Sequence, residues 1–218
     1  MTPRASPDRL SGLHVLADAS PRWCHSPVAQ ARAACAGGAS AIQLRAKHAL
    51  DRELLVWAAE IRALTQLAGA LFLVNDRFDL ALAAGADGAH LGQDDLPPAR
   101  IPPAARERLL LGRSTHTLEQ ASAARGEPID YVAFGPVFGT RSKDSRWGPR
   151  GLAQLAAVVH CVRPLPVVAI GGIDAGNAAS VREVGAAGFA VISAVAGAGE
   201  PEAATRTLVA AWRGGAGA

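Results

Sequence analysis

The sequence is poor in cysteine and aromatic residues and has no long run of one charge. Its three cysteines, Cys24, Cys35 and Cys161, are odd in number and widely separated. We therefore expect neither a disulfide framework nor a clustered zinc site. Aromatic residues make up only 5% of the chain, and the net charge of +3 comes from scattered Arg and Lys. A groove that binds nucleic acid by base stacking is therefore not expected.

Segments typical of secretion or membrane insertion are also missing. The first dozen residues contain Arg4, Asp8 and Arg9 and no apolar core, and no later apolar run approaches the roughly 20 residues of a membrane span. We therefore expect a cytoplasmic protein without membrane partners. The mildly basic pI, near 9.1, fits a small anionic substrate.

What the sequence does contain is a strand and helix unit that recurs along its 218 residues. Apolar runs predict strands at 13–17, 41–44, 71–74, 88–91, 109–112, 131–134, 167–170 and 189–192. One-sided apolar patterns predict helices at 28–36, 52–67, 78–84, 98–106, 118–125, 152–159, 177–184 and 202–212. This alternation of strands and helices predicts that neighbouring strands pair in parallel. Eight such strands are enough for the sheet to close into a barrel. We predict an α/β protein with a single (β/α)8 TIM-barrel domain over residues 1–218, of which residues 1–12 form a loosely ordered extension.

Two predicted strands end in carboxylates. Asp76 follows the apolar run 71–74, and Asp95 follows the run 88–91. Since parallel strands point the same way, both carboxylates are expected at one edge of the barrel. Mg²⁺ binds through one or two carboxylates when waters and substrate phosphates complete its shell. The alternative is that each Asp only caps the next helix.

The other strand ends also carry polar residues, as expected for a barrel whose active site lies on the loops after the strands. Arg45 and Lys47 follow the second strand and can present a guanidinium and an ammonium to phosphate oxygens; the alternative is an ordinary solvated loop. Ser114 and His116 follow the fifth strand. His90 lies inside a strand and is interpreted as a packed residue, whereas a role for His116 stays open.

Two later loops have features of binding segments. Gly171 and Gly172 follow the seventh strand, where a backbone without side chains can approach a phosphate, and Ser193 stands at the matching position after the eighth strand. A tight turn is the alternative. The loop 135–149 is long and carries hydroxyls and Lys143, which indicates a lid or binding loop; plain disorder is the alternative.

The succession of motifs resembles the thiamine-phosphate synthase family. The motifs are QLRAK, VNDR, GADGAHLGQDDLP, GRSTHT, DYVAFGPVFGTRSK and VVAIGGIDAGNAASVREVGAAGFAVISA, which together cover about residues 42–194. The resemblance implies a transferase that joins 4-amino-5-hydroxymethyl-2-methylpyrimidine diphosphate to hydroxyethyl-methylthiazole phosphate, with release of diphosphate and formation of thiamine phosphate. It also implies Mg²⁺ as cofactor.

The resemblance assigns roles to individual positions. Asp76 and Asp95 correspond to the Mg²⁺ ligands. The implied pyrimidine-diphosphate contacts are Gln43, Leu44, Arg45, Ala46, Lys47, Asn75, Ser114 and Lys143. The implied thiazole-phosphate contacts are Thr140, Arg141, Ser142, Gly172, Ile192 and Ser193. Of these, Arg45, Lys47, Ser114 and Lys143 are the implied catalytic groups. Arg77 departs from the family pattern, in which a second Asp is frequent, and the stretch 145–150 has no counterpart.

Other functions remain open from the sequence. A thiazole tautomerase shares the barrel and the thiazole-phosphate pocket but needs no diphosphate cradle, whereas this chain retains Asp76, Asp95, Lys47 and Lys143. A phosphate-ligand sensor on the same fold would bind without Mg²⁺. A phosphate-binding isomerase or epimerase would need a general base that the sequence does not clearly supply.

Overall fold

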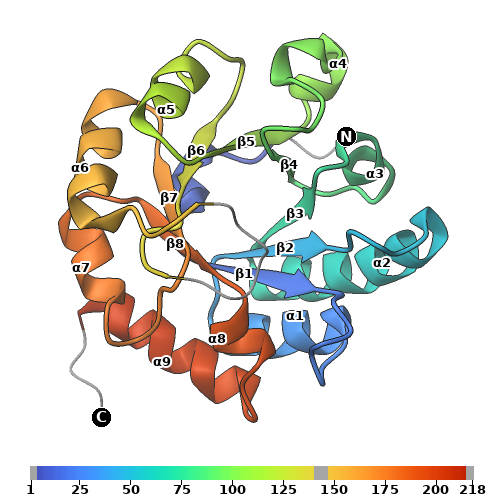
Figure 1. Cartoon of the computed structure of the whole chain (residues 1–218). Coiled ribbons are helices and arrows are strands. Elements are labelled where there is room, and N and C mark those ends of the chain that lie inside the picture. Colours follow the sequence, from blue (N-terminus) through green and yellow to red (C-terminus); the bar gives the residue numbers. More distant parts are fainter. Residues whose placement is uncertain (1–3, 140–146, 215–218) are drawn as a thin grey trace.

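The computed structural model describes residues 4–139 and 147–214. Parallel strands close into a barrel in the order β1 to β8, and β8 pairs with β1. Figure 1 looks into this barrel and shows the helices arranged around it. The strands are β1 (Gly12–Asp18), β2 (Ala41–Arg45), β3 (Leu71–Asn75), β4 (Gly88–Leu91), β5 (Leu110–Thr115), β6 (Tyr131–Phe134), β7 (Val167–Ile170) and β8 (Gly188–Val191). The predicted barrel is confirmed.

Helices connect successive strands on the outside of the barrel. They are α1 (Pro27–Ala36), α2 (Asp51–Ala68), α3 (Phe78–Ala83), α4 (Pro103–Arg106), α5 (Leu118–Ala124), α6 (Gly151–Cys161), α7 (Ala178–Glu183), α8 (Ser193–Ala196) and α9 (Pro201–Arg213). Short 3-10 turns are η1 (Pro7–Leu10) and η2 (Pro98–Arg100). Within the described ranges, no helix is long and apolar enough to cross a bilayer.

Side chains alternate between two hydrophobic layers along each strand, as the two-residue period of a strand requires. In β3, Leu71 and Leu73 belong to the cluster inside the barrel, whereas Phe72 and Val74 belong to the cluster between strands and helices. The same alternation in the other strands decides which residues can reach the barrel interior. Chemistry at the mouth therefore comes from inward positions near the carboxyl ends of the strands.

Three elements differ from the prediction. Strand β5 extends to Thr115, so Ser114 lies inside the strand and not in the loop after it. The predicted helix 98–106 is split into η2 and α4, because Pro102 and Pro103 disfavour helical backbone in the residue before each of them. Helix α8 spans only four residues, too few to give a periodic pattern.

The segment before β1 also differs from the loosely ordered extension that the sequence suggested. Residues Pro7–Leu10 form η1, and the Leu10 side chain is fully buried in the cluster inside the barrel. The backbone N–H of Gly12 donates to the carbonyl of Ala187 at 3.1 Å. These contacts make residues 7–12 part of the barrel.

Candidate active site at the carboxyl end of the barrel

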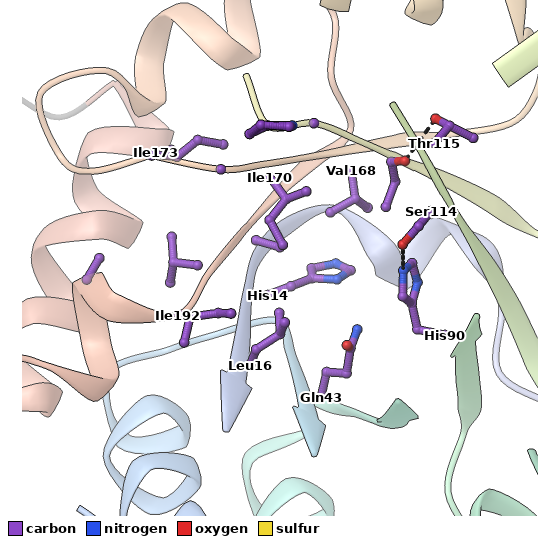
Figure 2. A pocket seen from close by; sticks show the side chains of 18 of the residues that line it. His14, Leu16, Gln43, His90, Ser114, Thr115, Val168, Ile170, Ile173 and Ile192 are labelled. Carbon is purple, nitrogen blue, oxygen red and sulfur yellow. Dashed lines mark hydrogen bonds between the residues drawn. The ribbon is translucent and has the colours of Figure 1, made fainter. Parts of the chain in front are cut away.

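A cavity opens in the barrel interior, lined by inward side chains of the strands and by the loops that follow β6, β7 and β8. Figure 2 shows the polar side chains of His14, Gln43, His90 and Ser114 directed toward this space, with Val168 and Ile170 on another side of it and Leu16 beside Ile192. Polar and apolar side chains thus line different parts of the cavity. Such a surface suits a flat, partly polar ring.

Gln43 supplies an acceptor to the cavity. It occupies an inward position of β2 and is 5% exposed. Its Oε1 is buried and has no hydrogen-bond partner in the described part of the chain. Since a buried acceptor without a partner is costly, the group is suited to an N–H donor on a ligand.

The two predicted metal ligands lie together. Burial raises the pKa of the Asp76 carboxyl, and the neighbouring Asp95, within side-chain hydrogen-bonding reach, raises it further. Lys47 lowers this pKa through an ion pair, with its Nζ 3.3 Å from Oδ2 of Asp76. Two carboxylates that are brought together in this way attract a cation.

The backbone holds both carboxylates in place. Asp76 has a φ of 67°, in the left-handed region, and its N–H donates to the carbonyl of His90 at 2.7 Å. Oδ2 of Asp95 accepts from the N–H of Gly92 at 2.5 Å. The backbone of Asp76 and the carboxylate of Asp95 are therefore each held by a contact at the end of β4.

Arg45 points to the same end of the barrel but is already paired. Its Nη1 donates to Oδ1 of Asp18 at 2.8 Å, and its buried Nε has no hydrogen-bond partner among the described residues. Asp18 is almost fully buried and also accepts from Nε1 of Trp23 at 2.9 Å. Arg45 and Lys47 line a second, polar depression beside the cavity, so Asp18 sets the direction of the guanidinium.

Arg113 supports the loop that carries Asp95. It faces outward from β5, its Nη1 donates to the carbonyl of Gly92 at 2.5 Å, and its Nε lies 3.3 Å from Oε2 of Glu127. The Gly92 N–H in turn holds Asp95. The buried Arg113 thus helps to position the Asp95 carboxylate indirectly, through the backbone of Gly92.

The loop after β7 approaches the loop after β6 closely. Gly171 and Gly172 have φ values of 103° and 66°, and a Cβ on Gly172 would lie 2.8 Å from Cβ of Phe138 and would also collide with the carbonyl oxygen of Gly139. Neither Gly172 nor Ile173 uses its N–H in a backbone hydrogen bond to a described residue. Ile192 and Ser193 line the cavity beside this loop.

His116 lines the cavity rim and packs against Trp147. The two rings are stacked at 5.4 Å, and Nδ1 of His116 lies 2.6 Å from the carbonyl oxygen of Gly135. Since a carbonyl only accepts, Nδ1 carries the proton. The Arg150 guanidinium lies over the other ring of this stack, 4.8 Å from the Trp147 centroid. Part of the stretch without a family counterpart thus packs against His116, a residue that lines the cavity.

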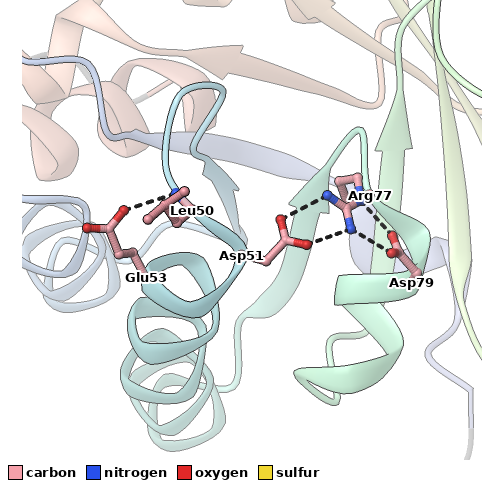
Figure 3. Close-up of polar contacts among 5 residues, drawn as sticks. All are labelled: Leu50, Asp51, Glu53, Arg77 and Asp79. Carbon is pink, nitrogen blue, oxygen red and sulfur yellow. Dashed lines mark hydrogen bonds and ion pairs between the residues drawn. The ribbon is translucent and has the colours of Figure 1, made fainter.

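Arg77 does not belong to the carboxylate pair. Figure 3 shows its guanidinium between Asp51, at the start of α2, and Asp79, in α3. The Asp79 carboxylate, followed by Asp51, raises the pKa of Arg77. The backbone N–H of Leu50 donates to Glu53 at 3.0 Å, which caps α2. These exposed contacts join the loop after β2 to the loop after β3.

The structure therefore brings most predicted residues to one end of the barrel. Gln43, Ser114, Gly172, Ile192 and Ser193 line the cavity, and Arg45 and Lys47 line the depression beside it. Asp76 contacts Lys47 and lies next to Asp95. The Leu44 side chain is fully buried in the outer layer and Ala46 packs against that layer, so Leu44 can offer a ligand only its backbone. Asn75 ends β3 and is buried. Thr140, Arg141, Ser142 and Lys143 lie outside the described residues.

Sequence reasoning missed three inward polar residues. Asp18 lies at the end of β1, His14 lies deeper in the same strand, and Tyr131 lies at the start of β6. His90 was interpreted as a packed residue; it is buried, but it also lines the cavity. Counting every second residue back from Asp18 would have found His14. Tyr131 and His90 lie on the opposite alternation from Phe134 and Leu91, the residues that end β6 and β4.

Comparisons with known proteins match the whole barrel. The family model described as Thiamine monophosphate synthase matches residues 13–195. The thiamine-phosphate synthase of Anaeromyxobacter dehalogenans is 51% identical over 210 residues, which cover 95% of this chain and 90% of that protein. The thiamine-phosphate synthase of Methanoculleus marisnigri is 51% identical over 178 residues, 82% of this chain and 84% of that protein.

A solved structure shows the same likeness. The thiamine phosphate pyrophosphorylase from Pyrococcus furiosus superposes with a TM-score of 0.83 at 38% identity, and the match covers 95% of this chain and 98% of that chain. A 3-hexulose-6-phosphate synthase superposes with a TM-score of 0.64 at 18% identity, a likeness of fold alone.

Proposed function

Because the chain belongs to the thiamine-phosphate synthase family, and therefore joins 4-amino-5-hydroxymethyl-2-methylpyrimidine diphosphate to hydroxyethyl-methylthiazole phosphate, we propose that this transfer takes place in the cavity at the carboxyl end of the barrel. One observation carries the proposal. The carboxylates of Asp76 and Asp95, together with Lys47, lie at the same end of the barrel as a cavity whose buried Gln43 acceptor has no partner among the described residues.

Asp76 and Asp95 would hold Mg²⁺. The raised pKa of Asp76 supports this, because burial and a second carboxylate both disfavour its anionic form until a cation arrives. In the described ranges no group of three or more His, Cys, Asp or Glu side chains could hold a metal. A two-carboxylate site suits an ion that takes its remaining ligands from water and diphosphate. When bound, Mg²⁺ would neutralise the charge of the leaving diphosphate.

Gln43 and Ser114 would bind the pyrimidine diphosphate. The amino group of the pyrimidine is an N–H donor that matches the partnerless Oε1 of Gln43. The Ser114 hydroxyl lines the same cavity and would donate to the diphosphate. The apolar wall of Val168, Ile170 and Ile192 would cover the ring and exclude water.

The thiazole phosphate would occupy the loops after β7 and β8. The backbone N–H groups of Gly172 and Ile173 make no backbone hydrogen bond to described residues, and Ser193 lies beside them. Loops after the seventh and eighth strands are the recurrent phosphate site of barrels. The implied contacts at Thr140, Arg141 and Ser142 stay predictions.

These residues fit a reaction that needs no protein nucleophile. As the diphosphate departs, negative charge develops on its oxygens and positive charge on the aminopyrimidine, and the thiazole nitrogen then forms the new bond to the methylene carbon. Lys47 and Arg45 would stabilise the departing oxygens, with Asp18 holding the Arg45 guanidinium in direction. The predicted role of Lys143 is the same. Preorganised cations are effective here because they act where charge develops.

An assay with both substrates tests the proposal. Purified protein with Mg²⁺ should release diphosphate and form thiamine phosphate in equal amounts, and a chelator should stop both. The thiazole phosphate alone serves as a control for tautomerase activity. Binding of both substrates without turnover, or turnover that a chelator leaves unchanged, would contradict the proposed site. A cytoplasmic location without nucleic-acid or membrane partners stays a prediction.

A further inference from the structure

Three side chains are linked by hydrogen bonds into a chain that runs from the barrel interior to the cavity. The Tyr131 hydroxyl lies 2.9 Å from Nδ1 of His90, and Nε2 of His90 lies 2.8 Å from Oγ of Ser114. The three residues come from β6, β4 and β5. Figure 2 shows the contact between Ser114 and His90 at the cavity. Only the Ser114 end of this chain has a role in the proposed reaction.

Packing fixes the inner end of the chain. Tyr131 is 1% exposed, and its ring lies against the backbone of Gly112, where a Cβ would collide with the ring and the hydroxyl. The rings of His90 and His14 lie 5.5 and 6.4 Å from the Tyr131 ring. The phenol therefore has one position, and burial raises its pKa, which keeps its proton in place.

Counting protons leaves two arrangements for a neutral His90. In the first, Tyr131 donates to Nδ1 and the Nε2–H of His90 donates to Ser114. In the second, Ser114 donates to Nε2 and the Nδ1–H of His90 donates to Tyr131. Hydroxyl groups can donate and accept, so distances alone permit both.

The buried Tyr131 hydroxyl decides between them. In the second arrangement its hydrogen would need another acceptor, and within residues 4–139 and 147–214 its only side-chain hydrogen bond is the one to His90. A buried O–H without an acceptor loses its hydrogen bonds to water and gains none in return, which is unfavourable. In the first arrangement every buried hydrogen is used, and the Ser114 hydrogen is left for an acceptor in the cavity.

We propose that Tyr131 and His90 are positioning residues that fix the Ser114 hydroxyl as a hydrogen-bond donor toward the bound pyrimidine diphosphate. The inference rests on the proposed function, because it assumes that Ser114 contacts this substrate. Phosphate oxygens accept and do not donate near neutral pH, so a serine in the opposite orientation could not bind them. As Ser114 donates, the Nε2–H of His90 stabilises the charge that grows on its oxygen.

Nitrogen NMR of the unmodified protein tests the proton positions without any activity assay. In a two-bond ¹H–¹⁵N spectrum, His90 should show a protonated Nε2 and an unprotonated Nδ1; a His90→Asn variant identifies its signals. A protonated Nδ1, in either a neutral or a doubly protonated ring, would overturn the proposal. This result does not depend on whether the protein turns over its substrates.

A double-mutant cycle tests the consequence for catalysis. Tyr131→Phe should lower kcat roughly 3- to 10-fold, the value of one hydrogen bond, with KM for the pyrimidine diphosphate changed less than twofold. In a Ser114→Ala background the same Tyr131→Phe change should have no further effect on kcat. Equal effects in both backgrounds would mean that Tyr131 acts only through packing, and would overturn the inference.

A matched variant controls for lost stability. Thr205→Val removes another fully buried hydroxyl, one that donates to the carbonyl of Pro201 in α9, far from the site. Its melting temperature should fall as much as that of Tyr131→Phe, while kcat stays unchanged. If Ser114→Ala alone leaves kcat unchanged, the proposed contact between Ser114 and the pyrimidine diphosphate is wrong. The NMR test of the proton positions on His90 is independent of that outcome.

Discussion

Replacing Asp76 by Asn and by Ala should separate the effect of its charge on the reaction rate from the effect of its backbone conformation on stability. Both changes remove a charge that we propose binds Mg²⁺, so both should lower the Mg²⁺-dependent rate on the order of 10²–10³. They differ in stability, because Asp76 has a φ of 67°. Asn adopts the left-handed region readily, whereas Ala there costs about 1–2 kcal/mol.

The stability difference can be stated as a melting temperature. For a chain of this size about 1 kcal/mol corresponds to about 2–4 °C, so without Mg²⁺ the Ala variant should melt roughly 2–8 °C below the Asn variant. The Asn variant should melt at or above the wild type, since it removes a buried anion whose pKa is raised by burial and by Asp95. A folded pKa above the unfolded one means that wild-type stability falls as pH rises through that interval. The Asn variant should lack this fall.

Calorimetry and steady-state rates, each with and without Mg²⁺, provide the measurement. Mg²⁺ should raise the melting temperature of the wild type and not that of either variant, because a ligand stabilises the state that binds it. Asp94→Asn is the matched control, since Asp94 is the exposed neighbour of Asp95. An Asn variant that Mg²⁺ stabilises as much as the wild type, or that keeps its rate, would refute the metal assignment.

Three further predictions concern pH, the glycine loop and the thiols. Burial lowers the pKa of His14 from 6.5 to about 4, so the free energy of unfolding measured with urea should fall by on the order of 3 kcal/mol as pH drops from above 6.5 toward 4. His14→Gln should flatten this dependence on pH, and an unchanged dependence would count against a buried neutral ring. Gly172→Ala should weaken binding of the thiazole phosphate more than that of the pyrimidine diphosphate, because its Cβ would displace Gly139; calorimetric titration that finds equal losses would remove the loop from the monophosphate site. Burial raises the pKa of the Cys35 thiol to about 11, so at pH 8 an alkylating reagent should modify the exposed Cys24 quickly and Cys35 only after unfolding; fast modification of both in the native protein would disprove this.

The sequence predicted the barrel well because short apolar runs alternate with helical patterns eight times, and eight parallel strands can close. It also predicted which residues gather at the carboxyl ends, since strand ends are visible as abrupt changes from apolar to polar residues. Asp76 and Asp95 were found in this way. Their closeness is a consequence of β3 and β4 being neighbours.

The remaining parts of the site depend on contacts that no local pattern contains. Asp18 is paired with Arg45 across two strands, 27 positions apart in sequence, and Arg113 reaches Asp95 only through the backbone of Gly92. Tyr131 has the apolar neighbours of any core residue, and its role depends on the missing side chain of Gly112. Such pairings become visible only when the barrel is closed.

The seam between β1 and β8 joins an early part of the chain to a late one. During synthesis, Leu10 and β1 leave the ribosome long before Ala190 and Ile192 exist, so the barrel interior that buries Leu10 cannot yet be complete. An unfinished chain therefore exposes apolar strands together with half of a binding cavity, and it can hold neither substrate. Ligands of the cavity can stabilise only the finished protein, and chaperones rather than ligands are the protection available to the nascent one.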